Sequence, residues 1–135
     1  MNIQEDHVSF EVAKLLKDKG FDKYPMFPCY KEDTGEFIDI PTTLDTINYC
    51  FIPAPTQAIV MKWLRKVHDI HIELNWDKGN QLYSFQIWKL GKYQPEISSL
   101  DLWRIYKDDN YSGEWKYEEA CEAAIKYCLV NIIQK

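Results

Sequence analysis

The feature that most constrains this chain is a pair of segments in which apolar and polar residues alternate. From Ile70 to Trp76 every second residue is apolar, and the same period of two recurs from Tyr83 to Ile87. Such alternation is typical of a β-strand with one buried face, because successive side chains point to opposite sides. Between the two segments, residues 77–80 read Asp-Lys-Gly-Asn, a composition typical of a turn. The sequence therefore predicts a β-hairpin over residues 70–88.

The position of the loop sets which residues pair. If residues 77–80 form the loop, Trp76 faces Gln81. The apolar face then pairs Leu74 with Tyr83, Ile72 with Phe85 and Ile70 with Ile87, and the other face pairs Glu73 with Ser84 and His71 with Gln86. A slip of one residue would mix the two faces, so we expect the apolar face to be buried. The other face carries His71, Glu73, Ser84, Gln86 and Trp88.

A first helix is predicted over residues 10–19. Ser9 is a favourable N-cap, and Gly20 suits the position just beyond the helix end. Phe21 is expected to fold back onto the helix, as in a Schellman motif.

Two further helices are predicted, over residues 57–68 and about 116–133. Thr56 is the expected N-cap of the earlier one, which leads almost directly into the hairpin. Its expected buried stripe is Ile59, Val60, Trp63, Leu64 and Val67. The expected stripe of the last helix is Cys121, Ala124, Ile125, Cys128 and Ile132.

Shorter strands complete the prediction. Residues 27–30, 37–40 and 49–52 are short apolar runs interrupted by proline and turn residues, as is typical of strands. Residues 91–99 are expected to form a loop, and residues 100–107 another strand. The predicted fold is a single α+β domain spanning residues 1–135. In it, three helices pack on one face of a small, mainly antiparallel sheet that contains the helix-to-hairpin unit.

Composition narrows the class of partner. The net charge is −5, and the 16 lysine and arginine residues are interleaved with 21 acidic ones. Binding of duplex nucleic acid normally requires a basic patch, so the charge balance argues against nucleic acid as a partner.

The chain contains no apolar run of the roughly 20 residues that span a bilayer. The first ten residues lack the features of a secretory signal. We therefore expect a cytoplasmic protein without membrane contact, in which Cys29, Cys50, Cys121 and Cys128 are free thiols.

The sequence shows no recognisable metal-binding, phosphate-binding or catalytic motif. The cysteines form no C-x-x-C pair, and no phosphate-binding or nucleophile motif occurs. His68 and His71 have a suggestive spacing, but one falls at a helix end and the other on a strand. A histidine at a helix C-terminus is expected to interact favourably with the helix dipole. We predict no catalytic residue, cofactor or metal, and an enzyme is the least favoured reading.

The polar face of the hairpin is the remaining candidate site. Trp88 is the one large aromatic side chain on it, and aromatic residues make up 15% of the chain. Because tryptophan and tyrosine are enriched at interface cores, we expect a surface that binds another protein. The alternatives are that residues 102–106 fold over Trp88, or that the chain binds single-stranded nucleic acid by stacking on Trp88 and Trp103. Self-association through a sheet edge is a further possibility.

Three runs of this chain carry a resemblance: SFEVAKLLKDKGF, PAPTQAIVMKWLRKVHDIHIEL and YEEACEAAIKYCLVNII. They are similar to those of a group of small proteins from prophages and mobile elements of gut anaerobic bacteria. The resemblance spans most of the chain and is weakest at residues 22–48 and 91–110. The resemblance to that group implies no particular activity, ligand or catalytic residue. The resemblance implies only an intracellular accessory role.

Overall fold

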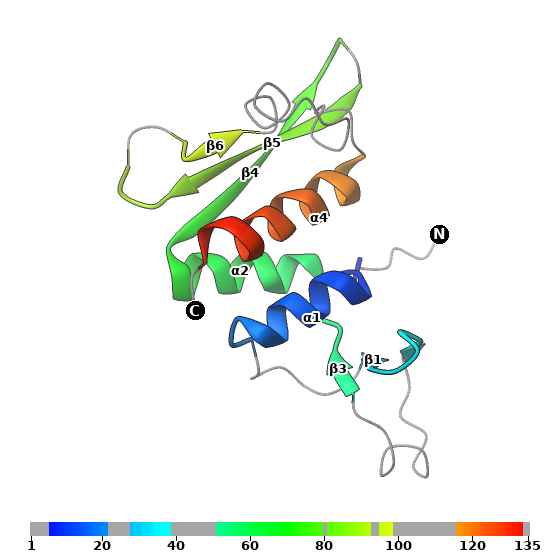
Figure 1. The fold of residues 1–135 in the computed structure, drawn as a ribbon. Helices are drawn as coiled ribbons and strands as arrows, with labels where there is room; N and C mark the ends of the chain where they lie inside the picture. The colour runs from blue at the N-terminus through cyan, green and yellow to red at the C-terminus, as the bar shows by residue number, and fades with distance from the viewer. Residues whose placement is uncertain are drawn as a thin grey trace.

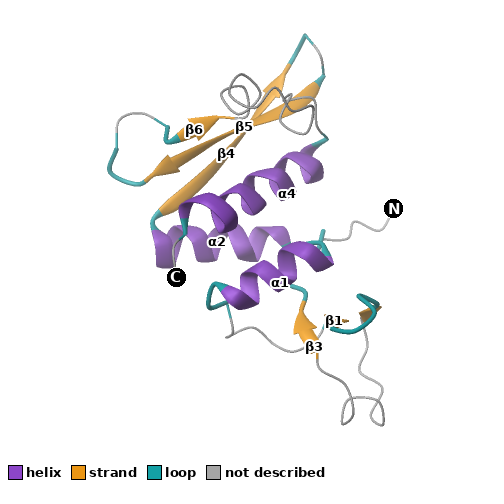
Figure 2. Ribbon diagram, in the orientation of Figure 1, coloured by secondary structure: helices purple, strands orange, loops and turns teal. Residues whose placement is uncertain are grey.

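The computed structural model describes residues 6–21, 28–38, 51–79, 81–92, 95–98 and 116–133, and confirms the α+β class (Figures 1 and 2). Its elements in chain order are α1 (Phe10–Asp18), β1 (Cys29–Lys31), β2 (Phe37–Ile38), β3 (Phe51–Pro53), α2 (Gln57–His68), β4 (Ile70–Asp77), β5 (Leu82–Lys89), β6 (Ile97–Ser98), α4 (Tyr117–Tyr127) and a π-helical segment (Cys128–Ile132). None of the helices in these ranges has the length and apolar character needed to cross a membrane.

The described strands form two antiparallel sheets of three strands, ordered β2-β1-β3 and β4-β5-β6. The helices lie between them (Figure 1). Helix α4 packs against β4 and β5, and α2 packs against β4, whereas α1 packs mainly against α4 and β3. The hairpin sheet therefore has α2 and α4 on one face. The division into two sheets was not part of the sequence prediction.

Helix α1 begins and ends as predicted. The Ser9 side chain accepts a hydrogen bond from the backbone N–H of Val12 at 3.2 Å. At the other end the N–H of Phe21 donates to the carbonyl of Leu16 at 2.9 Å, the bond expected of a Schellman motif. Gly20 has a φ of +94°, a left-handed conformation that glycine adopts without steric cost. The Phe21 side chain is buried and covers the end of the helix.

Helix α2 has the predicted bounds and the predicted N-cap, Thr56, but its buried stripe is different. Val60 and Leu64 are fully buried, whereas Ile59 and Val67 are 39% and 61% exposed. Gln57 is buried in their place, because its side chain donates to the backbone carbonyl of Glu118 on α4. The packing of α2 against α4 therefore turns the helix away from the orientation that its apolar residues alone would favour.

The β4–β5 hairpin forms, but the predicted register is wrong by two residues. Asp77 pairs with Leu82, so the loop is residues 78–81, one residue later than predicted. Asp77 remains in the strand because its side chain accepts a hydrogen bond from the N–H of Gly79 at 2.9 Å, and Gln81 adopts a φ of +57° to close the loop. As a result, Leu74 faces Phe85 and Ile72 faces Ile87.

A shift of two residues leaves both faces of the hairpin intact, because side chains alternate with a period of two. The predicted apolar face is therefore buried as expected. Ile72 is 3% exposed and Phe85 is fully buried beneath the helices. The buried residues that α4 and the π-helical segment contribute are Ala120, Cys121, Ala124, Ile125, Cys128 and Leu129, and α1 and α2 add Val12, Ala13, Leu16, Val60 and Leu64 to the same core. Those of α4 and the π-helical segment confirm the predicted stripe of the last helix, except that Ile132 is only half-buried.

The remaining strand predictions have mixed outcomes. Strands β1, β2 and β3 overlap the predicted runs at residues 27–30, 37–40 and 49–52. The predicted loop at residues 91–99 instead contains β6, which pairs with β5 through Gln86 opposite Ser98. A two-residue strand carries too short a pattern to be recognised in sequence. The predicted strand at residues 100–107 lies outside the described residues.

His68 lies in the last turn of α2, as predicted, and its ring is partly buried. Its Nε2 atom is buried and has no hydrogen-bond partner among the described residues, and its ring lies 4.6 Å from that of Trp63. Burial first, and the nearby charge of Lys89 second, lower the pKa of His68 below the ordinary value of 6.5. Burial at this helix end therefore disfavours the charged form of the His68 ring.

We expect the free energy of unfolding to fall as the pH is lowered from about 7.5 to about 5.5. Because the pKa of His68 is lowered in the folded state, the unfolded state takes up a proton at higher pH, and acid favours unfolding. Urea unfolding at both pH values should show a smaller pH dependence in His68→Gln than in wild type. An unchanged pH dependence in the variant would contradict this assignment.

Candidate functional site

The polar face of the hairpin, here called the outer face, brings the five predicted residues together. It lies on the side of the β4-β5-β6 sheet away from α2 and α4. His71 sits directly opposite Trp88, and Glu73 sits opposite Gln86. Ser84, on the same face, is opposite Asn75. All five predicted residues are half-buried.

Asp77 and Leu82 also lie on the outer face, as do Asn75 and Ser98. Asn75 alternates with Glu73 along β4, so the same period of two identifies it in the sequence. Ser98 is opposite Gln86 on β6 and extends the face by a third strand. The sequence shows no signal for Ser98, because β6 has only two residues and is too short to show an alternation of apolar and polar residues.

The position of Trp88 on the outer face is set by a hydrogen bond to the neighbouring strand. Its indole Nε1–H donates to Oε2 of Glu73 at 3.0 Å. The two residues are diagonal neighbours, since Trp88 pairs with His71 and Glu73 pairs with Gln86. A charged acceptor makes such a bond stronger than a neutral one. Glu73 therefore orients the indole ring.

The outer face has little charge. Its described positions on β4 and β5 hold Glu73 and Asp77 as acids and His71 as the one titratable base, and none of them holds lysine or arginine. The remaining positions are Leu82, hydroxyl and amide side chains, and Trp88. Such a surface offers hydrogen-bond donors and acceptors around one aromatic ring, and no cations for a phosphate backbone.

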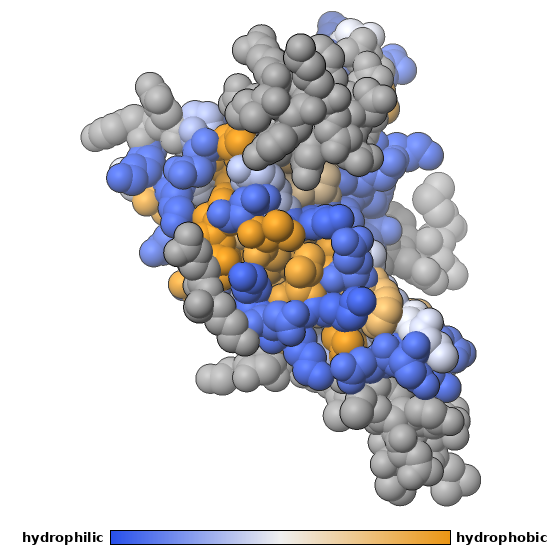
Figure 3. Space-filling model, in the orientation of Figure 1, coloured by the Kyte–Doolittle hydropathy of each residue, from blue (hydrophilic) through white to orange (hydrophobic). Residues whose placement is uncertain are grey.

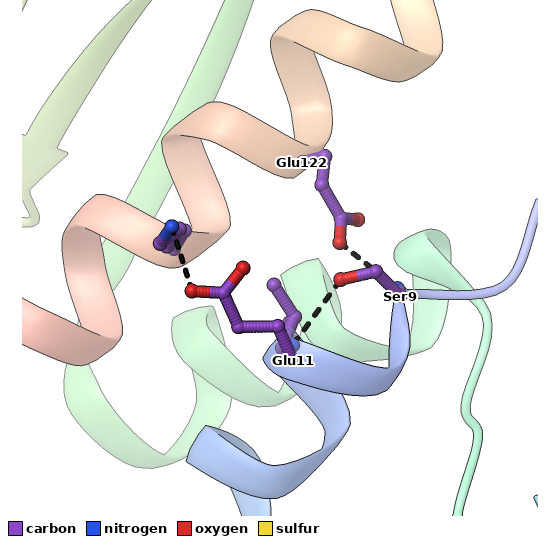
Figure 4. Close-up of polar contacts among 5 residues, drawn as sticks. Ser9, Glu11 and Glu122 are labelled. Atoms are coloured by element: carbon purple, nitrogen blue, oxygen red, sulfur yellow. Dashed lines mark hydrogen bonds and ion pairs between the residues drawn. The ribbon is translucent and has the colours of Figure 1, made fainter. Parts of the chain in front are cut away.

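A second candidate is a cleft of about 480 Å³ where α1, α2 and α4 meet. Five acidic residues contribute to its lining: Asp6, Glu11, Glu118, Glu119 and Glu122. Glu122 on α4 points toward the start of α1, where Oε1 accepts from the N–H of Ser9 at 2.9 Å (Figure 4). Its other oxygen, Oε2, accepts from the Gln57 side chain at 3.3 Å. Glu122 thus joins the N-terminal ends of two helices, where negative charge is favourable.

A second acidic residue of this cleft also has a structural partner. Glu11 forms an ion pair with Lys126 at 2.8 Å (Figure 4). No group of three or more His, Cys, Asp or Glu side chains within the described ranges is arranged to hold a metal ion. Burial raises the pKa of Cys121, beside an adjoining pocket, to about 11, so its thiol is a poor nucleophile. We interpret the cleft as the junction that holds the three helices together.

The helical layer also presents hydrophobic surface. Figure 3 shows hydrophobic residues gathered over this layer and surrounded by hydrophilic ones. The large hydrophobic residues that are exposed come from many different elements: Phe37, Ile59, Val67, Trp76, Leu90, Tyr117 and Val130. Exposure of single large hydrophobic residues from different elements is ordinary for a folded protein and does not by itself define a site.

Comparison with protein-family models, with curated proteins and with solved structures found no match to this chain. The function must therefore be argued from the chemistry of the residues themselves. The predicted cover at residues 102–106 and the stacking residue Trp103 lie outside the described residues. The outer face, with Trp88 near the end of β5, is the site on which a functional hypothesis can be built.

Proposed function

We propose that this chain is a non-enzymatic accessory module that binds another protein through the outer face of its hairpin sheet. The observation that carries the proposal is the arrangement of Trp88. A large aromatic ring is held by Glu73 at 3.0 Å, opposite His71 and next to the Glu73–Gln86 pair. Tryptophan is over-represented among the residues that dominate binding energy, and a side chain already held in one orientation loses less conformational freedom on binding.

The chemistry of the outer face favours a protein partner of neutral, polar character. Amide and hydroxyl groups at Asn75, Ser84 and Gln86 suit hydrogen bonds to backbone or side-chain groups of such a partner. Binding of single strands combines stacking with a positively charged groove. Because the described outer face lacks lysine and arginine, single-stranded nucleic acid is the second candidate.

The sequence resemblance and the buried thiols support a proposal about the biological setting. We propose that the partner is a protein of the host cell or of a phage or mobile element, as the resemblance implies. A cytoplasmic location is part of the same proposal. Cys29, Cys121 and Cys128 are free and buried, as suits a reducing compartment.

The proposal is tested by replacing Trp88 with alanine. Tagged wild type and Trp88→Ala are used to recover partners from the organism that encodes the chain, and the main recovered protein is purified and titrated against both. Trp88→Ala is expected to weaken its binding by roughly 30-fold or more, the loss that defines a dominant interface residue. Glu73→Ala should weaken binding less, since it frees the indole without removing it.

Tyr117→Ala is the matched control. It removes an exposed aromatic ring that packs on Tyr83, away from the outer face, and should bind the partner as wild type does. Equal binding by wild type and Trp88→Ala would refute the proposal. Binding of a fluorescent oligothymidine that weakens steeply with salt and is lost in Trp88→Ala would favour the nucleic-acid alternative.

A further inference from the structure

Strand β4 has a free edge within the described part of the chain. It pairs with β5 over all eight of its residues, without a bulge, and no described strand pairs with its other side. The carbonyl of Asp69, just before the strand, accepts from the N–H of Leu90 just after β5. Because backbone groups alternate in direction along an antiparallel strand, those of Ile70, Ile72, Leu74 and Trp76 point away from β5.

This edge lacks several of the features by which sheet proteins prevent edge pairing, namely proline, lysine, bulges and very short strands. Its acidic side chains are Glu73 and Asp77. Strand β4 has eight residues, Ile70–Asp77, and contains neither proline nor lysine. Its outward-pointing N–H and C=O groups therefore form a template to which a further strand can bond.

We propose that β4 pairs antiparallel with β4 of a second copy of this chain. Two three-stranded sheets would then join into one continuous sheet of six strands across a two-fold axis. This inference is independent of the proposed partner of the outer face. In such a dimer the two outer faces would lie side by side on the same side of the joined sheet.

The side chains of β4 select the register of this pairing. A two-fold axis at Glu73 would place Glu73 directly opposite Glu73 of the second copy, and like charges in that position are destabilising. An axis at Leu74 places Glu73 opposite Asn75 of the second copy, and Ile72 opposite Trp76. It also places the outward-pointing backbone groups of Leu74 against each other, as a hydrogen-bonded pair requires.

Burial along β4 favours the same register. The beginning of the strand is covered, with Ile70 at 1% and Ile72 at 3% exposure. Its end is open, and Trp76 is 54% exposed although it lies on the same face as Ile72. An axis at Leu74 uses residues 71–77 and packs each Trp76 beside Ile72 of the other copy. An axis at Ile72 would leave Trp76 outside the paired strands.

The charge of residue 75 tests the register in the purified full chain. Asn75→Lys places a lysine opposite each Glu73, and Asn75→Glu places a glutamate there. Sedimentation of wild type over a wide range of concentrations should show a monomer–dimer equilibrium. Because each dimer contains two such pairs, Asn75→Lys should tighten and Asn75→Glu should weaken the dimer, each by roughly 2- to 30-fold at low salt.

Hydrogen exchange provides a second measurement on wild type. The amides of Ile72 and Leu74 should gain protection as concentration rises, whereas those of Glu73 and Asn75, bonded to β5 in either state, should not. If wild type and Asn75→Lys both sediment as monomers at every concentration, the inference is overturned. A strand of a different protein would then be the candidate partner of this edge. A dimer that both variants shift in the same direction would overturn it as well.

Discussion

Replacing Phe85 with alanine is expected to lower the free energy of unfolding by about 3–5 kcal/mol. Phe85 is fully buried on the inner face of β5, opposite Leu74 and beneath the helices. It is one of the largest fully buried side chains described. The substitution removes its contacts with the sheet and the helices and leaves a cavity that rigid neighbours fill only in part. Urea unfolding followed by circular dichroism measures the change.

Gln86→Ala is the matched control for Phe85→Ala. Gln86 follows directly in the chain but lies on the outer face and is half-buried, so its loss should change the free energy of unfolding by about 0.5 kcal/mol or less. Equal effects of the two substitutions would contradict the assignment of inner and outer faces. They would also remove the basis of the proposed function.

The second large effect is expected at Glu122. Replacing it with alanine should lower the free energy of unfolding by about 1–3 kcal/mol, because hydrogen bonds to charged groups are stronger than neutral ones. The change leaves the N–H of Ser9 without its carboxylate acceptor and the side chain of Gln57 with only the carbonyl of Glu118. Chemical denaturation at neutral pH and low salt is the appropriate measurement.

Glu119→Ala serves as the control for this prediction. Glu119 lies in the first turn of α4, one turn before Glu122, and lines the same cleft, but it is exposed. Its effect is expected to be limited to a weaker interaction with the helix dipole, about 0.3–1 kcal/mol. If Glu119→Ala proves as destabilising as Glu122→Ala, net charge rather than the helix junction accounts for the effect.

The outer face shows why part of the site was predictable. His71, Glu73, Ser84, Gln86 and Trp88 follow from the period of two, and that period is unaffected by an error of two residues in register. The register itself was mispredicted because Asp77 can stand either in the turn or at the end of the strand. It suits a turn by composition, but its side chain caps the loop while its backbone stays in the strand. Local hydrogen bonds of this kind are not visible in hydrophobic periodicity.

The sequence by itself determined the starts and ends of α1 and α2, the hairpin and its two faces, but not the change from α-helix to π-helix at Cys128. These features depend on interactions between residues close in the chain, such as the Ser9 and Thr56 caps and the left-handed Gly20. Only the tertiary structure decided the orientation of α2, the separation of the strands into two sheets and the junction at Glu122. Each of these depends on contacts between residues far apart in sequence, as between Gln57 and Glu122, whose partners no local pattern identifies.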